Sequence, residues 1–201
     1  MYVKICGLRE PEHVDVAVEA GARAVGVVMN ETSSRRATET EAAAVVSATA
    51  GRVDTVLVVN DMPAAEAAQT ARRLGFDILQ LHGPAYGRAD FVAALSVLPR
   101  VWRATSLATA PSLQVGAHGE EILLLDSPSP GSGERWDSSS LAADAPAGTW
   151  LLAGGLTPGN VADAVRAVQP WGVDVSSGVE TAPGRKDGDL ISAFVRAALQ
   201  A

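Results

Sequence analysis

The chain has 201 residues, of which 47% are hydrophobic and 19% charged, and its formal net charge is −7. This composition is ordinary for a globular protein and lacks the basic surface that nucleic-acid binding requires, so we expect no nucleic-acid partner. The single cysteine excludes an internal disulfide, and no apolar run approaches the roughly 20 residues of a membrane helix. We therefore expect a cytoplasmic protein without a signal peptide or a membrane partner.

Short apolar segments alternate with alanine-rich segments of helical spacing along the whole chain. The expected strands are Val3–Cys6, Ala24–Met29, Thr55–Asn60, Ile78–Leu81, Val101–Ala104, Ile122–Asp126, Trp150–Ala153 and Gly172–Ser176. The expected helices are Glu12–Ala20, Thr40–Ala48, Ala64–Leu74, Ala89–Leu98, Asn160–Val168 and Asp189–Leu199. Gly21 and Gly75 follow helices, as expected for C-caps.

Most of these strands are continuous apolar runs, which is typical of a parallel sheet covered by helices. Eight strands about 25 residues apart predict an α/β fold, a single-domain (β/α)₈ TIM barrel over residues 1–201. The alternative is a doubly wound open sheet, which would need a glycine-rich dinucleotide loop where the chain has Cys6-Gly7-Leu8-Arg9-Glu10. The fifth helix, within Leu107–His118, should be short or irregular because it contains Pro111 and Gly116.

Polar residues gather at the carboxyl ends of the expected strands, where barrels hold their active sites. They are Cys6, Asn60, His82, Arg103, Asp126, Ser176 and Ser177. Each also has a structural interpretation: a lone cysteine is often a small buried hydrophobe, and a strand-end aspartate often caps a helix. His82-Gly83 is compatible with a turn, and Arg35-Arg36 with a solvent-exposed basic pair. The joint placement of these residues, more than any one of them, indicates an active site.

Two glycine-containing segments suggest a phosphate site. Gly154-Gly155 ends the seventh strand, and Ser177-Gly178 follows the eighth. Many barrels bind phosphate with these two loops, because glycines let backbone N–H groups approach the oxygens and a short helix adds a favourable dipole. The alternative for Gly154-Gly155 is a tight turn without a ligand.

Several segments together resemble the signature sequences of the phosphoribosylanthranilate isomerase family. They are Lys4-Ile5-Cys6-Gly7, Ser33-Ser34-Arg35, Gln80-Leu81-His82-Gly83, Leu125-Asp126-Ser127, Ala153-Gly154-Gly155-Leu156, Asp174 to Glu180 and Gly184-Arg185-Lys186-Asp187. They follow in the family's order from Val3 to about Ala198. The resemblance implies a (β/α)₈ barrel that isomerises N-(5-phosphoribosyl)anthranilate to 1-(2-carboxyphenylamino)-1-deoxyribulose 5-phosphate, an Amadori rearrangement in tryptophan biosynthesis.

The chain departs from the family pattern in two places. The glycine-rich loop after the sixth strand has Pro130 for a glycine, Trp136 for a phenylalanine and Ser138 for a tryptophan. The second strand ends in Gly26-Val27-Val28-Met29, without the family's aromatic residues. We still expect Ser127–Ser140 to form a lid that carries Trp136 over the substrate.

The resemblance also implies a role for each site residue. Asp126 would be the general acid and Cys6 the general base, while Arg35 would bind the anthranilate carboxylate. His82 and Asp174 would be further substrate contacts. Gly154, Gly155, Ser177 and Gly178 would bind the phosphate through backbone N–H groups. The reaction needs no metal and no cofactor, the partner is a small phosphorylated substrate, and the protein would be a monomer or homodimer.

Two rival functions remain open from the sequence. The histidine-pathway aminoaldose isomerase, including its dual-substrate relatives, has an aspartate where the first strand here ends in Cys6 and a second phosphate site that His82 to Tyr86 does not match. A catalytically silent barrel that serves as a binding module is the other, although such a protein should have lost Cys6 or Asp126.

Strand parity predicts one buried ion pair. Side chains alternate along a strand, so Lys4 shares the face of Cys6 and lies one layer deeper in the barrel. A buried ammonium needs a partner, and Asp174 is the inward acid on the adjacent eighth strand. The pair would also favour a Cys6 thiolate. In the alternative, Lys4 has the opposite parity and faces solvent or the helices.

Overall fold

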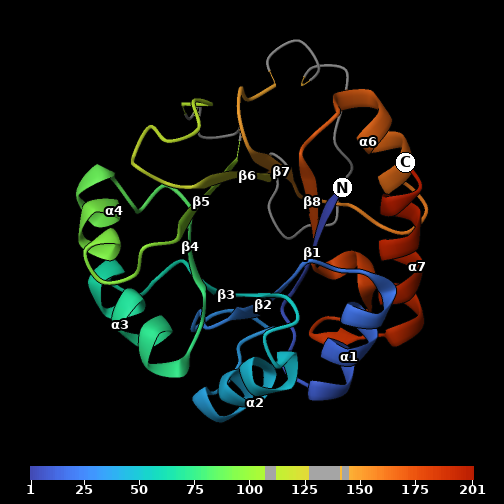
Figure 1. Cartoon of the computed structure of the whole chain (residues 1–201), viewed down its shortest axis with the longest axis horizontal. Coiled ribbons are helices and arrows are strands. Elements are labelled where there is room, and N and C mark those ends of the chain that lie inside the picture. Colours follow the sequence, from blue (N-terminus) through green and yellow to red (C-terminus); the bar gives the residue numbers. More distant parts are fainter. Residues whose placement is uncertain (107–111, 127–140, 142–144) are drawn as a thin grey trace.

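Eight parallel strands close into a barrel in chain order, β1 to β8, and Figure 1 looks along its axis. The computed structural model describes residues 1–106, 112–126, 141 and 145–201. The strands are β1 (Tyr2–Cys6), β2 (Ala24–Val28), β3 (Asp54–Val59), β4 (Ile78–His82), β5 (Val101–Ser106), β6 (Ile122–Asp126), β7 (Trp150–Leu152) and β8 (Gly172–Val175). The predicted barrel is confirmed, and the open-sheet alternative is wrong because β8 pairs with β1.

Helices surround this ring on its outer side (Figure 1). They are α1 (Pro11–Ala20), α2 (Glu39–Thr49), α3 (Ala64–Leu74), α4 (Arg88–Leu95), α6 (Val161–Val168) and α7 (Gly188–Leu199). Gly21 and Gly75 end α1 and α3 with φ of 103° and 81°, which confirms the expected left-handed C-caps. A capping box between Thr38 and Glu41 begins α2.

The segment between β5 and β6 differs from the other units. Residues 112–121, within the described part of the chain, form turns and no helix, as expected for this segment, whereas residues 107–111 lie outside it. Arg103 points outward from β5 and donates to Glu120 at 2.7 Å and to the carbonyl oxygens of Ser112 and Gln114 at 3.1 and 3.0 Å. The prediction of Arg103 as a pocket residue is therefore wrong, because its side chain secures this turn segment on the outside of the barrel.

In seven of the eight strands the even-numbered residues point into the barrel and the odd-numbered ones pack beneath the helices. In β7 the phase is reversed, so that Leu151 points inward and Trp150 and Leu152 point outward. One buried cluster inside the barrel contains Cys6, Val58, Trp102 and Leu124, while a larger cluster includes Ile5, Leu57 and Leu123 between strands and helices. The inward side chains at the carboxyl ends of the strands face one common space.

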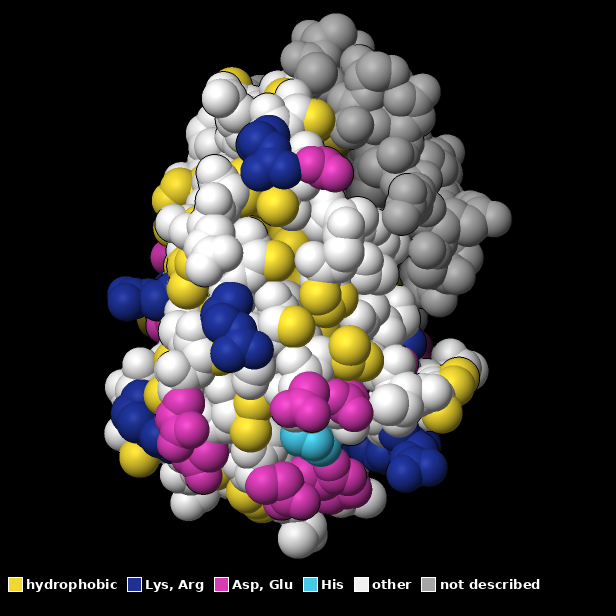
Figure 2. Space-filling view, turned by 90° about the vertical axis from the view of Figure 1, so that its right-hand side faces the viewer, with side chains coloured by type: hydrophobic (Ala, Val, Ile, Leu, Met, Phe, Trp, Pro, Cys, Tyr) yellow, Lys and Arg dark blue, Asp and Glu magenta, His cyan; other side chains and the backbone are white. Residues whose placement is uncertain are grey.

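After β8 the chain makes a 3-10 turn, η2 (Ser177–Val179), and a small hairpin of β9 (Glu180–Ala182) and β10 (Arg185–Lys186). On the face over α1, α6 and α7, acidic and basic side chains are interspersed with small groups of hydrophobic atoms, and acidic side chains gather towards the lower end of the view (Figure 2). Within the residues described above, no helix is both long and apolar enough to cross a membrane.

Candidate active site

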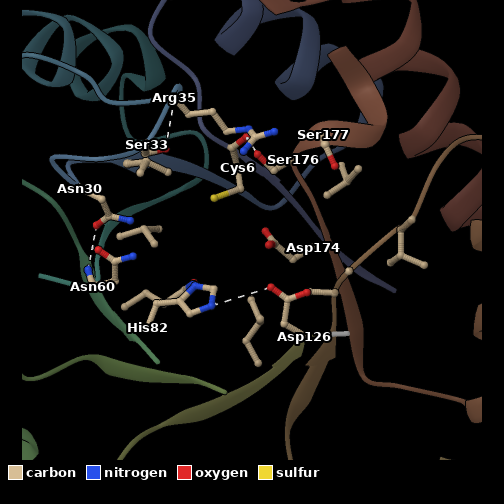
Figure 3. A pocket seen from close by; sticks show the side chains of 18 of the residues that line it. Cys6, Asn30, Ser33, Arg35, Asn60, His82, Asp126, Asp174, Ser176 and Ser177 are labelled. Atoms are coloured by element: carbon tan, nitrogen blue, oxygen red, sulfur yellow. Dashed lines mark hydrogen bonds and ion pairs between the residues drawn. The ribbon is translucent and has the colours of Figure 1, made fainter. Parts of the chain in front are cut away.

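A cavity of about 310 Å³ opens at the carboxyl end of the barrel. Most of the predicted site residues line it: Cys6, Arg35, His82, Asp126, Gly154, Gly155, Asp174 and Ser177. Gly178 does not. The volume matches a small-molecule site, and the lining combines a few convergent polar groups with apolar walls, as such sites usually do. Cys6 and Asp126 enter this space from opposite sides (Figure 3).

Cys6 ends β1 and is buried, with 6% of its surface exposed. Gly26 on the adjacent β2 leaves space for it, since a Cβ on that glycine would lie 3.0 Å from the Cys6 sulfur and 3.2 Å from Lys4 Nζ. Burial raises the pKa of Cys6, whereas the ammonium groups of Lys4 and Lys186 lower it only in part. Lys4 therefore favours the thiolate, as expected, but burial outweighs it and the resting residue is a thiol at neutral pH.

The predicted Lys4–Asp174 ion pair is confirmed. Lys4 is fully buried, and its Nζ donates to Asp174 Oδ1 at 2.7 Å between neighbouring strands in register. Burial by itself lowers the pKa of Lys4, but Asp174 and the Cys6 sulfur outweigh it and leave the pKa raised. The alternative with opposite parity is wrong, because Lys4 lies inside the barrel below Cys6.

Asp126 ends β6 and faces His82 across the pocket. Their closest approach is 3.8 Å between His82 Nε2 and Asp126 Oδ2 (Figure 3), which is too long for a direct hydrogen bond. Burial lowers the pKa of His82, and nearby Lys4 lowers it further while Asp174 opposes both. His82 is therefore neutral near pH 7 and can offer a ring N–H or a lone pair to a ligand.

The two glycine loops lie against each other at one side of the cavity. Gly154 and Gly155 have φ of 87° and 64°, a conformation that glycine adopts without strain. Within the described residues, the backbone N–H groups of Gly154, Gly155, Ser177 and Gly178 have no hydrogen-bond acceptor. Such groups are available to the oxygens of an anion. A Cβ on Gly178 would lie 1.8 Å from the Leu156 carbonyl oxygen, so this glycine is what allows the two loops to touch.

The family model for N-(5'-phosphoribosyl)anthranilate isomerase matches residues 3–197. The chain belongs to the N-(5'-phosphoribosyl)anthranilate isomerase family. The enzyme of this name from Geobacter metallireducens is 41% identical over 204 residues, which cover 98% of each sequence. The crystal structure of TrpF from Jonesia denitrificans is 52% identical, with a TM-score of 0.92 over 99% of this chain and 97% of that one.

A solved phosphoribosyl anthranilate isomerase in complex with reduced 1-(o-carboxyphenylamino)-1-deoxyribulose 5-phosphate is also similar. It is 29% identical and fits with a TM-score of 0.87 over the full length of both chains. The predicted family, fold and activity, that of a phosphoribosylanthranilate isomerase in tryptophan biosynthesis, are thereby confirmed.

Arg35, which the family resemblance places on the substrate carboxylate, already has a partner in this isomerase. Its Nε and Nη2 donate to the two carboxylate oxygens of Glu180 at 2.8 and 2.9 Å. Glu180 also accepts from Lys186 Nζ at 2.7 Å. Of the two bidentate edges of the guanidinium, one is therefore occupied by Glu180, and the other, formed by Nη1 and Nη2, is left for a ligand.

Asn30 and Gln80 line the pocket of this isomerase although the sequence analysis did not predict them, and Asn60, named only among the strand-end polar residues, is confirmed as a lining residue. Asn30 lines the pocket and its Oδ1 accepts from the Asn60 backbone N–H at 2.8 Å. Gln80 also lines the pocket and is 2% exposed, and its Oε1 has no hydrogen-bond partner in the described structure. The parity of His82 could have indicated Gln80. Glu180 and Lys186 lie within two of the quoted family segments, but nothing in the sequence pairs them with Arg35.

Within residues 1–106, 112–126, 141 and 145–201, no three His, Cys, Asp or Glu side chains are grouped closely enough to coordinate a metal ion. The expected lid, Ser127–Ser140 with Trp136, lies outside the described residues.

Proposed function

We propose that this isomerase opens and rearranges N-(5-phosphoribosyl)anthranilate with Asp126 as the general acid and Cys6 as the general base. One observation carries the proposal: the two groups enter a single pocket from opposite sides, and the pocket is bounded on one side by the paired glycine loops. A substrate with a phosphate at one end would thus lie between an acid and a base.

The first step is ring opening. Asp126 gives its proton to the furanose ring oxygen while the nitrogen lone pair forms the C1=N bond and the C1–O bond breaks. The ring oxygen becomes a hydroxyl group, and the product is a protonated Schiff base. Neutral His82, whose ring lies 3.8 Å from Asp126, places no fixed positive charge beside the acid.

The second step is proton removal from C2. The positive charge of the Schiff base next to C2 adds to that of Lys4 and lowers the pKa of Cys6, which burial otherwise raises. The Cys6 thiol then loses its proton to solvent. The resulting thiolate takes the C2 proton, and the electron pair of that C–H bond neutralises the nitrogen and leaves an enolamine. The enolamine becomes the ketone when its C2 hydroxyl loses a proton and C1 gains one. Cys6 is again a thiol after taking the C2 proton, and Asp126 regains a proton from solvent in place of the one that Cys6 released, so the reaction is an isomerisation without net proton change.

Binding is divided among three places in the pocket. The phosphate would accept from the backbone N–H groups of Gly154, Gly155 and Ser177, with Gly178 holding the loops together. The anthranilate carboxylate would meet the second edge of Arg35. His82 and Asp174 would contact the sugar hydroxyl groups between them.

The experiment measures the turnover of Asp126→Asn and Cys6→Ala, after each variant is shown to keep the wild-type fold. Each should lose at least about 100-fold in kcat, as expected when a general acid or base is removed. Glu39→Gln, in an ion pair with Arg73 on the outer helices, serves as the control and should keep wild-type turnover. Near wild-type turnover by either pocket variant would refute its assigned role. Assays with the bisphosphorylated histidine-pathway substrate should give no product. The single-domain organisation, the cytoplasmic location and the monomeric or dimeric state stay predictions.

A further inference from the structure

Glu180 lies beside the pocket residue Arg35 and accepts four hydrogen bonds. It is nearly buried, with 4% of its side chain exposed, and it binds Arg35 through two parallel hydrogen bonds. Arg35 is 18% exposed and lines the cavity, so the ion pair connects the pocket wall to the residues that follow β8. Burial tends to raise the pKa of Glu180, but its hydrogen bonds to Arg35 and Lys186 outweigh this and keep the pKa low.

Glu180 is itself fixed from its other side. Lys186 Nζ donates to Oε1 at 2.7 Å, and the backbone N–H of Gly184 donates to Oε2 at 3.3 Å. Lys186 also donates to the Ser176 carbonyl oxygen at 2.8 Å, which connects the group to the end of β8. A carboxylate with this many donors is not free to leave Arg35 when a ligand enters.

Arg35 keeps part of its hydrogen-bonding capacity. A guanidinium has five N–H donors, of which Glu180 takes two, and no acceptor in the described residues meets Nη1. The backbone N–H of Arg35 donates to Ser33 Oγ at 3.1 Å, so the main chain is held as well (Figure 3). The guanidinium is thus fixed at two points with one bidentate edge unoccupied within the described structure.

We propose that Glu180 is a positioning residue that orients Arg35 so that its Nη1–Nη2 edge receives the carboxylate of the aryl amine. This inference rests on the proposed function, in which Arg35 binds that carboxylate. An arginine held in one rotamer loses less side-chain entropy on binding than a mobile one, so the held edge binds more tightly. The residue does not touch the substrate and acts only through Arg35.

The experiment compares two ligands and three proteins by calorimetry at 25 °C. The ligands are reduced 1-(o-carboxyphenylamino)-1-deoxyribulose 5-phosphate and its counterpart without the carboxyl group. The proteins are wild type, Glu180→Gln and Glu39→Gln. Glu39 is the control because it also binds an arginine through two hydrogen bonds, from Nη1 and Nη2 of Arg73 at 2.8 and 2.7 Å, but on the outer surface.

We expect Glu180→Gln to weaken binding of the carboxylated ligand about tenfold, since one oriented charge-assisted contact is disturbed, and to change binding of the other ligand less than about twofold. Glu39→Gln should leave both affinities at wild-type values. If Glu180→Gln weakens the binding of both ligands equally, Glu180 has only a structural role and the proposal is overturned. Tighter binding of the carboxylated ligand would also overturn it, because Glu180 would then compete for Arg35. Equal affinity of the wild type for the two ligands would instead refute the assigned carboxylate site of Arg35 itself.

Discussion

Replacing Lys4 by methionine tests the electrostatics below the active site. The substitution keeps the volume of the side chain but leaves Asp174 without its partner inside the barrel. Removing one member of a buried ion pair costs about 3–5 kcal/mol, and because the Asp174 side chain is 10% exposed to the pocket we take the lower end, about 3 kcal/mol. For a chain of this size that corresponds to a thermal midpoint lower by about 6–12 °C.

The same substitution should change the reactivity of Cys6. Lys4 lowers the pKa of Cys6 against the effect of burial, so its removal should raise that pKa further and move the alkylation profile to higher pH. The stability difference should stay constant between pH 6 and 9. The folded pKa of Lys4 is raised, so its contribution is complete below the unfolded value and is lost only as pH rises through the folded one.

Arg103→Met is the matched control for Lys4→Met. Arg103 and Glu120 form an equally buried pair, with side chains 7% and 0% exposed, outside the pocket. This variant should lower the thermal midpoint without changing the alkylation profile of Cys6. If Lys4→Met leaves both the midpoint and the profile at wild-type values, the electrostatic role assigned to Lys4 is wrong.

The remaining predictions concern the pocket. Gly26→Ala should lower kcat at least about tenfold with a smaller change in KM, because its Cβ would lie 3.0 Å from the Cys6 sulfur; an unchanged kcat in steady-state assays would contradict this. Gly155→Val should raise KM sharply, because a side chain there strains the loop, whose φ is positive, and blocks the backbone N–H groups. Gly51→Val is the control: Gly51 also has a positive φ but has open space around it, so this variant should lower stability and leave KM unchanged. In wild type, iodoacetamide should label Cys6 half-maximally only above the usual thiol pKa, and rapid labelling at pH 7 would show that positive charge outweighs burial.

Much of the fold could be predicted because the strands are continuous apolar runs in regular alternation with helices. The bounds of α3 and β6 were predicted to the residue, and other elements shifted by a few residues at their ends. The alternation of side chains along a strand also predicted the Lys4–Asp174 ion pair, because Lys4 shares the inward face of Cys6 and Asp174 is the inward acid on the adjacent strand. For Arg103 the same reasoning was not available. Arg103 and Thr105 alternate with the apolar Trp102 and Ala104, but both faces of this strand are buried, so the alternation does not show which face is inward.

The electrostatics of the site could not be predicted from the sequence. Whether Cys6 is a thiol or a thiolate depends on the balance of burial against two ammonium groups, and that balance needs distances. The Arg35–Glu180 pair joins residues 145 positions apart, both outside the barrel strands, where no periodicity constrains the partner. The family-like segments therefore contain these residues but do not show their contacts.

The closing seam of the barrel has a consequence for how the enzyme is made. The charge partner of Lys4 is on β8, and Glu180 and Lys186 come later still, so Cys6 near the start of the chain is completed only by residues 174–186. During synthesis on the ribosome the first strand emerges long before its partners, and until then Lys4 has no counter-charge. A nascent or truncated chain that ends before β8 would carry the Cys6 thiol without Asp174, Glu180 and Lys186. A product that ends before these residues should therefore be inactive as well as unstable.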